Sequence, residues 1–267
     1  MEKEQLERSQ QNALALSAAM RLPLSDLFSR IRIIAAHEEM LTPFLRQELE
    51  AILRDGYRLL RLADSLAAAE CYELTEAAAV VFPLWEELGR GLEAARLLLG
   101  AGGRTLSYEL PEDNDRLRGD PAMLMRVILH LICNGLDAGD ADAAVTVRGS
   151  TAGSFAIITV TDEGCGIPPE QMETMFIPYE SRDRDGLPYQ APGLGLPLAR
   201  RVLEAHGGSL RLISDESGTT AICSLPLYEG SEIELHSPAP RYLDDLYSPL
   251  YTVLCNYLDP PWPYPGT

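Results

Sequence analysis

Four glycine-containing segments occur in a fixed order between residues 124 and 227, and they constrain the fold more than any other feature of the chain. They are LMRVILHLICNGLDAG (124–139), TDEGCGIP (161–168), PGLGLPLARRVLEAHGG (192–208) and SGTTAICSLPL (217–227). The first has the apolar spacing of a buried helix, and the third opens a helix with a glycine loop. The second and fourth place turn residues beside strand-forming residues. This alternation predicts a mixed domain of helices and strands.

The surrounding residues complete the same pattern. Helices are predicted over 84–99, 120–136, 168–175 and 195–205, and strands over 104–110, 144–148, 155–162, 210–214 and 219–225. Helices that cover one face of a mixed sheet form an α+β sandwich. We therefore expect three parts, which are a helical hairpin (1–72), an α/β sandwich domain (73–228) and an aromatic, proline-rich C-terminal tail (229–267). Within the tail, an apolar stretch over 242–258 predicts a helix that is bent at Pro249 and docks on the rest of the protein.

The N-terminal region has the pattern of two long helices, because apolar residues recur at helical spacing over 3–40 and again over 43–69. Pro23 lies inside the first helix and should kink it, because proline removes a hydrogen bond there. Thr42 and Pro43 are favoured N-cap and first-turn residues for the second helix. Two helices joined by a tight turn leave apolar stripes exposed, so we expect two hairpins to pair as a four-helix bundle in a homodimer. The alternative is a hairpin that packs on its own C-terminal domain.

The composition limits the partners of the chain. Its net charge is −18, whereas nucleic-acid binders concentrate basic residues on one surface, so we expect no nucleic-acid partner. The five cysteines are scattered without metal-binding or redox spacing, as in reduced cytoplasmic proteins. No stretch approaches the ~20 apolar residues of a membrane span. We therefore expect a cytoplasmic protein without a membrane span.

Together, the four segments resemble the nucleotide pocket of sensor histidine kinases and of the related ATPases of the gyrase, chaperone and mismatch-repair group. The resemblance covers about residues 74–227, and it implies that the ligand is ATP with Mg²⁺. The predicted hairpin likewise resembles the dimerisation and phosphotransfer domain of histidine kinases, including the stretch RLLRLADSL (58–66).

The resemblance assigns a metal ligand to the first segment. It implies that Asn134 coordinates the magnesium ion that bridges the phosphates, and Mg²⁺ does prefer oxygen ligands, few of them from protein. His130 lies one turn earlier on the same helix face. It is either a catalytic base or a replacement for the asparagine that is commoner at this position. Asp137, near the same edge, is either a further cofactor contact or a solvated charge at the helix end.

The second and fourth segments are implied to bind the adenine. Asp162 would accept a hydrogen bond from the adenine amino group. Gly164 and Gly166 let the backbone turn and approach the base, because neither has a Cβ. Thr219 and Thr220 match the family's final motif near the adenine.

The third segment is implied to bind the phosphates. Gly193, Leu194 and Gly195 lie at the start of a helix, where backbone N–H groups and the helix dipole favour anions. The preceding loop corresponds to the lid over the ATP. It contains Arg182 and Arg184, whose guanidinium groups either reach the phosphates or are solvated loop charges.

One expected residue is missing. Histidine kinases carry a phosphate-accepting histidine followed by an acidic residue, and the aligned segment AAMRLPL has Ala18 and Ala19 instead. A methyl group cannot attack a γ-phosphate, so self-phosphorylation at this site is impossible. The segment HEEMLTPF superficially repeats the pattern from His37, but it falls too near the second helix and should lie at the hairpin tip.

The leading hypothesis is therefore a cytoplasmic, dimeric histidine-kinase-like protein that binds Mg-ATP and has a degenerate phosphoacceptor. It would phosphorylate a partner in trans, such as a response regulator or partner kinase, or act as an ATP-regulated scaffold in a phosphorelay. The alternative is a non-catalytic interaction module, like the sporulation phosphotransferases and anti-sigma factors that share this fold.

Overall fold

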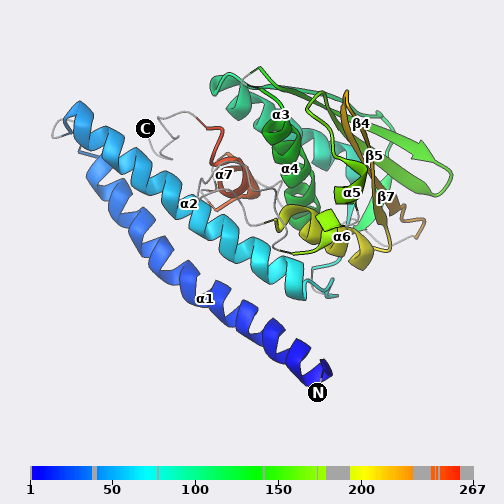
Figure 1. Ribbon diagram of the computed structural model, residues 1–267, viewed down its shortest axis with the longest axis horizontal. Helices are drawn as coiled ribbons and strands as arrows, with labels where there is room; N and C mark the ends of the chain where they lie inside the picture. Colours follow the sequence, from blue (N-terminus) through cyan, green and yellow to red (C-terminus); the bar gives the residue numbers. More distant parts are fainter. Residues whose placement is uncertain are drawn as a thin grey trace.

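The computed structural model describes residues 2–37, 41–76, 78–140, 142–172, 174–178, 193–230, 242–243, 245 and 247–258. These residues form a long helical hairpin that leans against an α/β sandwich (Figure 1). A short C-terminal helix lies between the two.

The hairpin consists of α1 (Glu2–Ala35) and α2 (Pro43–Cys71). Helix α1 continues through Pro23, so the proline interrupts the hydrogen-bond ladder without ending the helix. It ends five residues earlier than the predicted boundary at residue 40, where His37 Nδ1 donates to the Ile33 carbonyl at 2.8 Å and satisfies an acceptor of the last turn. Helix α2 begins as expected, with the Thr42 hydroxyl accepting the Leu45 N–H at 3.2 Å.

A glycine sets the spacing inside the hairpin. The rings of Phe28 and Tyr57 stack with their centres 4.6 Å apart, and both side chains are buried. A Cβ on Gly56 would lie 2.5 Å from the Phe28 ring. Helix α2 therefore needs glycine at this position, because any side chain would push the aromatic ring away.

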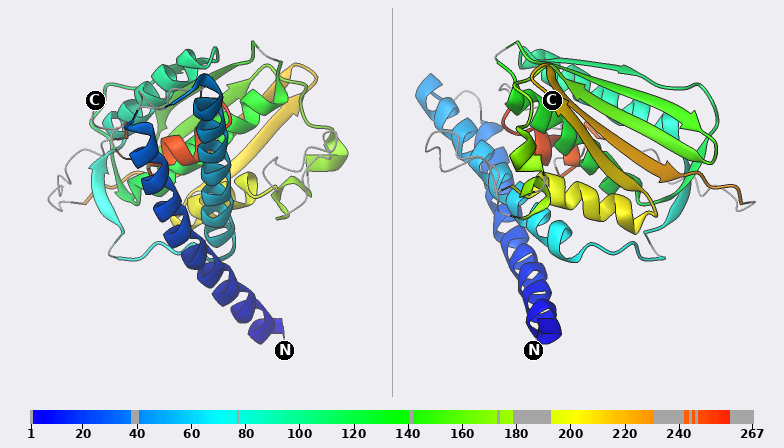
Figure 2. Two further views of the ribbon diagram at one scale, coloured as in Figure 1. Left: turned by 90° about the vertical axis from the view of Figure 1, so that its left-hand side faces the viewer. Right: turned by 45° about the vertical axis from the view of Figure 1, so that its right-hand side comes forward.

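The sandwich contains a five-stranded sheet in the order β2-β4-β5-β7-β6. The strands β2 and β4 are parallel, and the other pairs are antiparallel. Helices α3, α4 and α6 cover one face of this sheet (Figure 2). The elements are α3 (Leu84–Ala101), β2 (Thr105–Glu109), α4 (Pro121–Ala138), β4 (Ala144–Ala152), β5 (Phe155–Asp162), α5 (Pro169–Met172), η2 (Thr174–Phe176), α6 (Gly195–Ala205), β6 (Ser209–Asp215) and β7 (Gly218–Pro226). The α+β class of this part of the chain is thus as predicted.

The sequence did not predict two short strands, β1 (Val80–Pro83) and β3 (Arg116–Gly119), which pair antiparallel as a separate sheet. The residue that follows β3, Asp120, begins α4 and is bound to α6 through His206. The Asp120 N–H donates to His206 Nε2 at 3.0 Å, while His206 Nδ1 donates to the Val202 carbonyl at 2.7 Å. His206 therefore holds α6 against the entrance of α4.

Helix α4 is the centre of the core. Among the described residues it alone is long and apolar enough to cross a membrane, and 67% of it is buried inside the protein. Its N-terminus begins as expected, because the Asp120 carboxylate accepts the Met123 N–H at 3.1 Å. The apolar surface of the helix is used for packing against the sheet and against α6 and the C-terminal helix.

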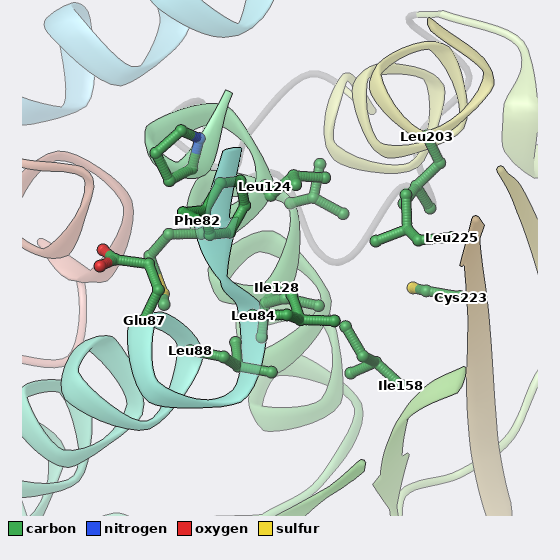
Figure 3. A pocket seen from close by; sticks show the side chains of 13 residues that line it. Phe82, Leu84, Glu87, Leu88, Leu124, Ile128, Ile158, Leu203, Cys223 and Leu225 are labelled. Atoms are coloured by element: carbon green, nitrogen blue, oxygen red, sulfur yellow. The ribbon is translucent and has the colours of Figure 1, made fainter. Parts of the chain in front are cut away.

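A small cavity of about 20 Å³ lies between α3, α4 and the sheet. Figure 3 shows that apolar side chains such as Leu84 and Ile128 surround it, while the carboxylate of Glu87 points away from them. That carboxylate instead accepts the Tyr242 hydroxyl at 2.6 Å and pairs with Arg90. A space this small and apolar holds one water at most, so it is a packing gap and not a ligand site.

The C-terminal segment packs between the hairpin and the sandwich, and its helix is called the wedge below. Helix α7 (Pro249–Leu254) lies between α2 and α4 (Figure 1), and Tyr251 and Leu254 are fully buried. The expected helix over 242–258 is wrong in extent, because Pro249 occupies the first turn and starts the helix instead of bending it.

Polar contacts join this wedge to the hairpin and to α4. The carbonyl of Val253 accepts Arg61 Nη1 at 3.2 Å, and Arg58 Nε donates to Asn256 Oδ1 at 2.8 Å. On the other side, the Tyr257 hydroxyl donates to the Cys133 carbonyl at 3.2 Å. The hairpin therefore packs on its own sandwich domain both directly, where α2 meets α6, and through α7.

A buried ion pair completes the contact between the hairpin and the sandwich. Asp64 of α2 is 8% exposed and receives Arg21 of α1 at 2.7 Å and Arg126 of α4 at 3.1 Å. Removal of one partner from such a buried pair is strongly destabilising, because a charge is left without compensation.

We expect Leu254→Ala to lower the free energy of unfolding by about 2–5 kcal/mol, because it leaves a cavity where α7 meets the core. Urea unfolding measures the change. The matched control is Leu243→Ala in the same segment, where the leucine is 39% exposed, and it should change stability by less than about 1 kcal/mol. Equal effects for the two variants would show that α7 does not dock as described.

Candidate functional site

A cavity of about 500 Å³ opens between α4, the turn after β5 and the start of α6. Its size falls within the range of roughly 300–1,000 Å³ that small-ligand sites occupy. The sequence-predicted residues that line it are His130, Asn134, Asp137, Asp162, Gly166, Gly193, Leu194, Gly195 and Thr219. Gly164 and Thr220 lie just outside the lining, and Arg182 and Arg184 lie outside the described residues.

Asp162, at the end of β5, is 9% exposed and held in one orientation. Its Oδ1 accepts the Gly164 N–H at 2.9 Å and the Thr219 N–H at 3.2 Å. Burial raises the pKa of this carboxyl, while the two backbone N–H donors lower it. In the part of the chain that the structure describes, no donor bonds Oδ2, so this oxygen remains available at the cavity wall.

The turn after Asp162 depends on glycine. Gly166 has φ +65°, and a Cβ there would lie 1.8 Å from the Asp215 carbonyl oxygen. A Cβ on Gly164 would lie 2.6 Å from the Cβ of Ala138. The turn thus packs its bare backbone against α4 and β6. Thr220 serves the sheet instead, with its hydroxyl 3.1 Å from that of Thr161.

The other end of the cavity is formed by the N-terminus of α6. Gly193 has φ +61°, and the helix starts two residues later without a side-chain cap. A Cβ on Gly195 would lie 3.5 Å from His130 Nδ1 and 3.7 Å from Asn134 Oδ1, so this helix end faces the polar side chains of α4. Backbone N–H groups at the start of a helix favour anions.

Asn134 is the exposed residue in an otherwise buried run of α4, from Leu124 to Leu136, and its side chain lines the cavity. Among the described residues, no three His, Cys, Asp or Glu side chains gather to hold a metal. Mg²⁺ usually keeps several waters and binds through few protein oxygens together with phosphates. A single amide oxygen beside an anion site fits that donor set.

His130 is buried and uncharged. Desolvation, followed by the positive charges of Arg61 and Arg126, lowers the pKa of its imidazole well below the usual 6.5. Its Nε2 lies 3.4 Å from the Ser65 hydroxyl of α2. A neutral imidazole here donates or accepts a hydrogen bond but presents no charge to a ligand.

Asp137 lies at the cavity rim, near the C-terminal end of α4, and receives the hydroxyl of Tyr257. The C-terminal segment therefore reaches the edge of the cavity. Burial raises the pKa of Tyr257, and the nearby Cys133 and Asp137 raise it further.

Sequence reasoning missed one lining residue with a charge, Arg61 of α2. The stretch RLLRLADSL (58–66), which contains Arg61, indicated the helical hairpin and not the cavity. Only the packing of α2 on the sandwich directs this side chain towards the cavity. Ala18 and His37 do not line the cavity, and His37 lies at the hairpin tip as expected.

Residues 119–229 match the family model of histidine kinase-, DNA gyrase B- and HSP90-like ATPases. This range contains α4, both glycine turns, α6 and the final hairpin, so the cavity belongs to an ATPase domain of the histidine-kinase type.

The curated relatives include sensor histidine kinases. ZraS of Salmonella typhi is 37% identical over 112 residues, which are 42% of this chain and 23% of ZraS. The C4-dicarboxylate transport sensor protein DctB of Rhizobium meliloti is 34% identical over 140 residues, or 50% of this chain and 22% of DctB. The circadian input-output histidine kinase CikA of Synechococcus elongatus is 29% identical over 214 residues, or 77% of this chain and 28% of CikA. The chain spans less than a third of the length of these relatives.

One solved structure has the same arrangement over most of the chain. Full-length ShkA, in a crystal structure in complex with AMPPNP, aligns with a TM-score of 0.65 and 18% identity over 84% of this chain and 47% of ShkA. The likeness is one of fold.

The pKa of His130 predicts a pH dependence of stability. The unfolded chain regains the usual pKa and binds a proton below pH 6.5, whereas the folded protein does not. Stability should therefore fall as the pH drops below that value, by at most about 1.4 kcal/mol for each pH unit from this group.

We expect His130→Asn to reduce the loss of unfolding free energy between about pH 7.5 and pH 5.5, because the proton-binding site is gone. Urea unfolding at the two pH values measures it. His37→Asn, which changes an exposed ring, is the control and should leave the loss unchanged. An unaltered loss in His130→Asn would contradict the buried, neutral state.

Proposed function

We propose that this protein is a histidine-kinase-like signalling protein that binds Mg-ATP in the cavity between α4 and α6. The observation that carries the proposal is the Asp162 carboxylate, which has one oxygen held by two backbone donors and the other open to the cavity. It lies in a domain whose relatives are sensor histidine kinases, at the opposite end of the cavity from a helix N-terminus.

The residues divide the nucleotide between two ends of the cavity. Asp162 accepts the adenine amino group, and Thr219 lies beside it. The N–H groups of Leu194 and Gly195 bind phosphate oxygens. Asn134 holds Mg²⁺, which supplies charge neutralisation at the phosphates when it is bound. The lid arginines and Asp137 stay predicted contacts.

Ala18, at the predicted phosphoacceptor position, limits where a phosphoryl group could go. Ala18 cannot take up a phosphoryl group, so any transfer goes to a partner in trans, a response regulator or a partner kinase, unless ATP only regulates a scaffold. Phosphoryl transfer depends mainly on positioning and charge stabilisation, so the same cavity can serve an external nucleophile.

The second candidate is an interaction module that has lost kinase activity. The depressed pKa of His130 favours it, because a buried neutral imidazole of low basicity is a poor general base near pH 7. ATP binding without transfer to any acceptor would distinguish this module from a kinase acting in trans.

We further propose that the hairpin forms a homodimer and that the protein is cytoplasmic. Large apolar side chains remain exposed along α1, with Leu22 at 79% and Ile33 at 64%. Eleven residues apart, the two lie on one face of the helix. Such a stripe is buried when two hairpins form a four-helix bundle.

The dimer is tested by the double variant Leu22→Glu/Ile33→Glu, which should convert a dimer into a monomer because charges cannot be buried in the bundle. Light scattering measures the molar mass. Leu97→Glu, at an exposed leucine of α3, is the control and should keep the dimer. A monomeric wild type would contradict the proposal.

ATP binding is tested by calorimetry with and without Mg²⁺. Asp162→Asn should weaken Mg-ATP binding by about tenfold, because a charge-assisted hydrogen bond becomes a neutral one. Asn134→Ala should remove most of the dependence on Mg²⁺. Glu109→Gln, on the exposed side of β2, is the control. Absence of saturable binding in the wild type would refute the proposed function.

Labelled ATP tests the route of the phosphate. The isolated protein should retain no label, because Ala18 offers no acceptor atom. Mapping of a stable label to His37 would show that the alignment of the phosphoacceptor is wrong.

A further inference from the structure

Arg61 connects the hairpin to the nucleotide cavity. It lies on α2, outside the residues that match the ATPase family, yet it lines the cavity together with Asn134 and His130. Its side chain is 7% exposed. Among the described residues, it is the lining residue with a fixed positive charge.

The charge of Arg61 lacks a counter-ion in the part of the chain that the structure describes. Nη1 donates to the Val253 carbonyl at 3.2 Å, and no carboxylate forms an ion pair with the guanidinium there. Arg21 and Arg126 behave differently, since both pair with Asp64. A buried guanidinium without an anion is unfavourable, so the site is incomplete without a negatively charged ligand.

The face of α2 that carries Arg61 is directed at the phosphate end of the cavity. Ser65, one turn later on the same face, lies 3.4 Å from His130 Nε2. The other ring nitrogen of His130 faces the first residue of α6, at 3.5 Å from the Cβ position of Gly195. The side chains of Ser65 and His130 therefore connect this face of α2 with the start of α6, whose N–H groups suit phosphate oxygens.

We propose that Arg61 binds the phosphate groups of the nucleotide and that the hairpin thereby closes the phosphate end of the cavity. The inference rests on the proposed function and extends it to a residue outside the ATPase domain. Guanidinium matches phosphate in charge and in the spacing of its donors. The Val253 carbonyl orients the side chain, so nucleotide binding depends on the docked C-terminal segment.

The experiment compares ATP and adenosine, because only ATP carries the phosphates. Both affinities are measured on the full chain by calorimetry, with adenosine also measured in competition with ATP. Arg61→Gln should weaken ATP binding by about tenfold to a hundredfold. Adenosine binding should stay within about twofold, since Asp162 and its turn are untouched. Arg30→Gln, at an exposed arginine of α1 outside the cavity lining, is the matched control and should bind both ligands as the wild type does.

Arg61→Lys keeps the charge but loses the fork of donors, so its loss of ATP affinity should be smaller than that of the glutamine variant. If Arg61→Gln does not fold, as shown by circular dichroism, the lysine variant decides on the same comparison of ATP with adenosine. Unchanged ATP affinity in the folded variant would overturn the role of Arg61 and leave the proposed function intact. Equal losses for ATP and adenosine would assign Arg61 a structural role and overturn the inference. A wild type that binds neither ligand would refute the proposed function itself.

Discussion

The hydrogen bonds of the Asp162 carboxylate support the whole site. One oxygen joins the end of β5 to the glycine turn and to the first residues of β7. Because that oxygen is fully used, the other oxygen points in one direction only. The adjoining turn packs against α4 without side chains, which brings Asn134 and the entrance of α6 around a common space. The Asp162 carboxylate and the turn beside it thus help to position both the predicted adenine end and the predicted phosphate end of the cavity.

Much of this arrangement could be predicted from local signals. The limits of β5 and α6 agree with the sequence, because alternation and the glycine before α6 mark them clearly. The pair β1–β3 was missed because each strand has four residues and gains its stability from the other. Arg61 was missed for a related reason. Its role depends on how α2 packs on distant residues, and spacing along one helix carries no information about that contact.

The C-terminal segment packs against both the hairpin and the sandwich, so that its buried side chains join the two hydrophobic cores. The ring centres of Tyr251 and Tyr57 of α2 are 6.4 Å apart. The neighbours of Tyr251 in α7 are buried, and the helix packs on α4. The buried Asp64 adds a polar tie between α1, α2 and α4, which favours one relative orientation over sliding of the helices. The position of α2, and therefore of every side chain it directs at the cavity, depends on these contacts.

The wedge formed by α7 also has a consequence for the order of assembly. The hairpin is translated before the sandwich, whereas α7, which packs between the two, is translated after it. Domains generally fold as units during synthesis, N-terminal parts first. The face of α2 that carries Tyr57 therefore stays uncovered until α7 has been made, and the hairpin and the sandwich join late in the folding of each new molecule.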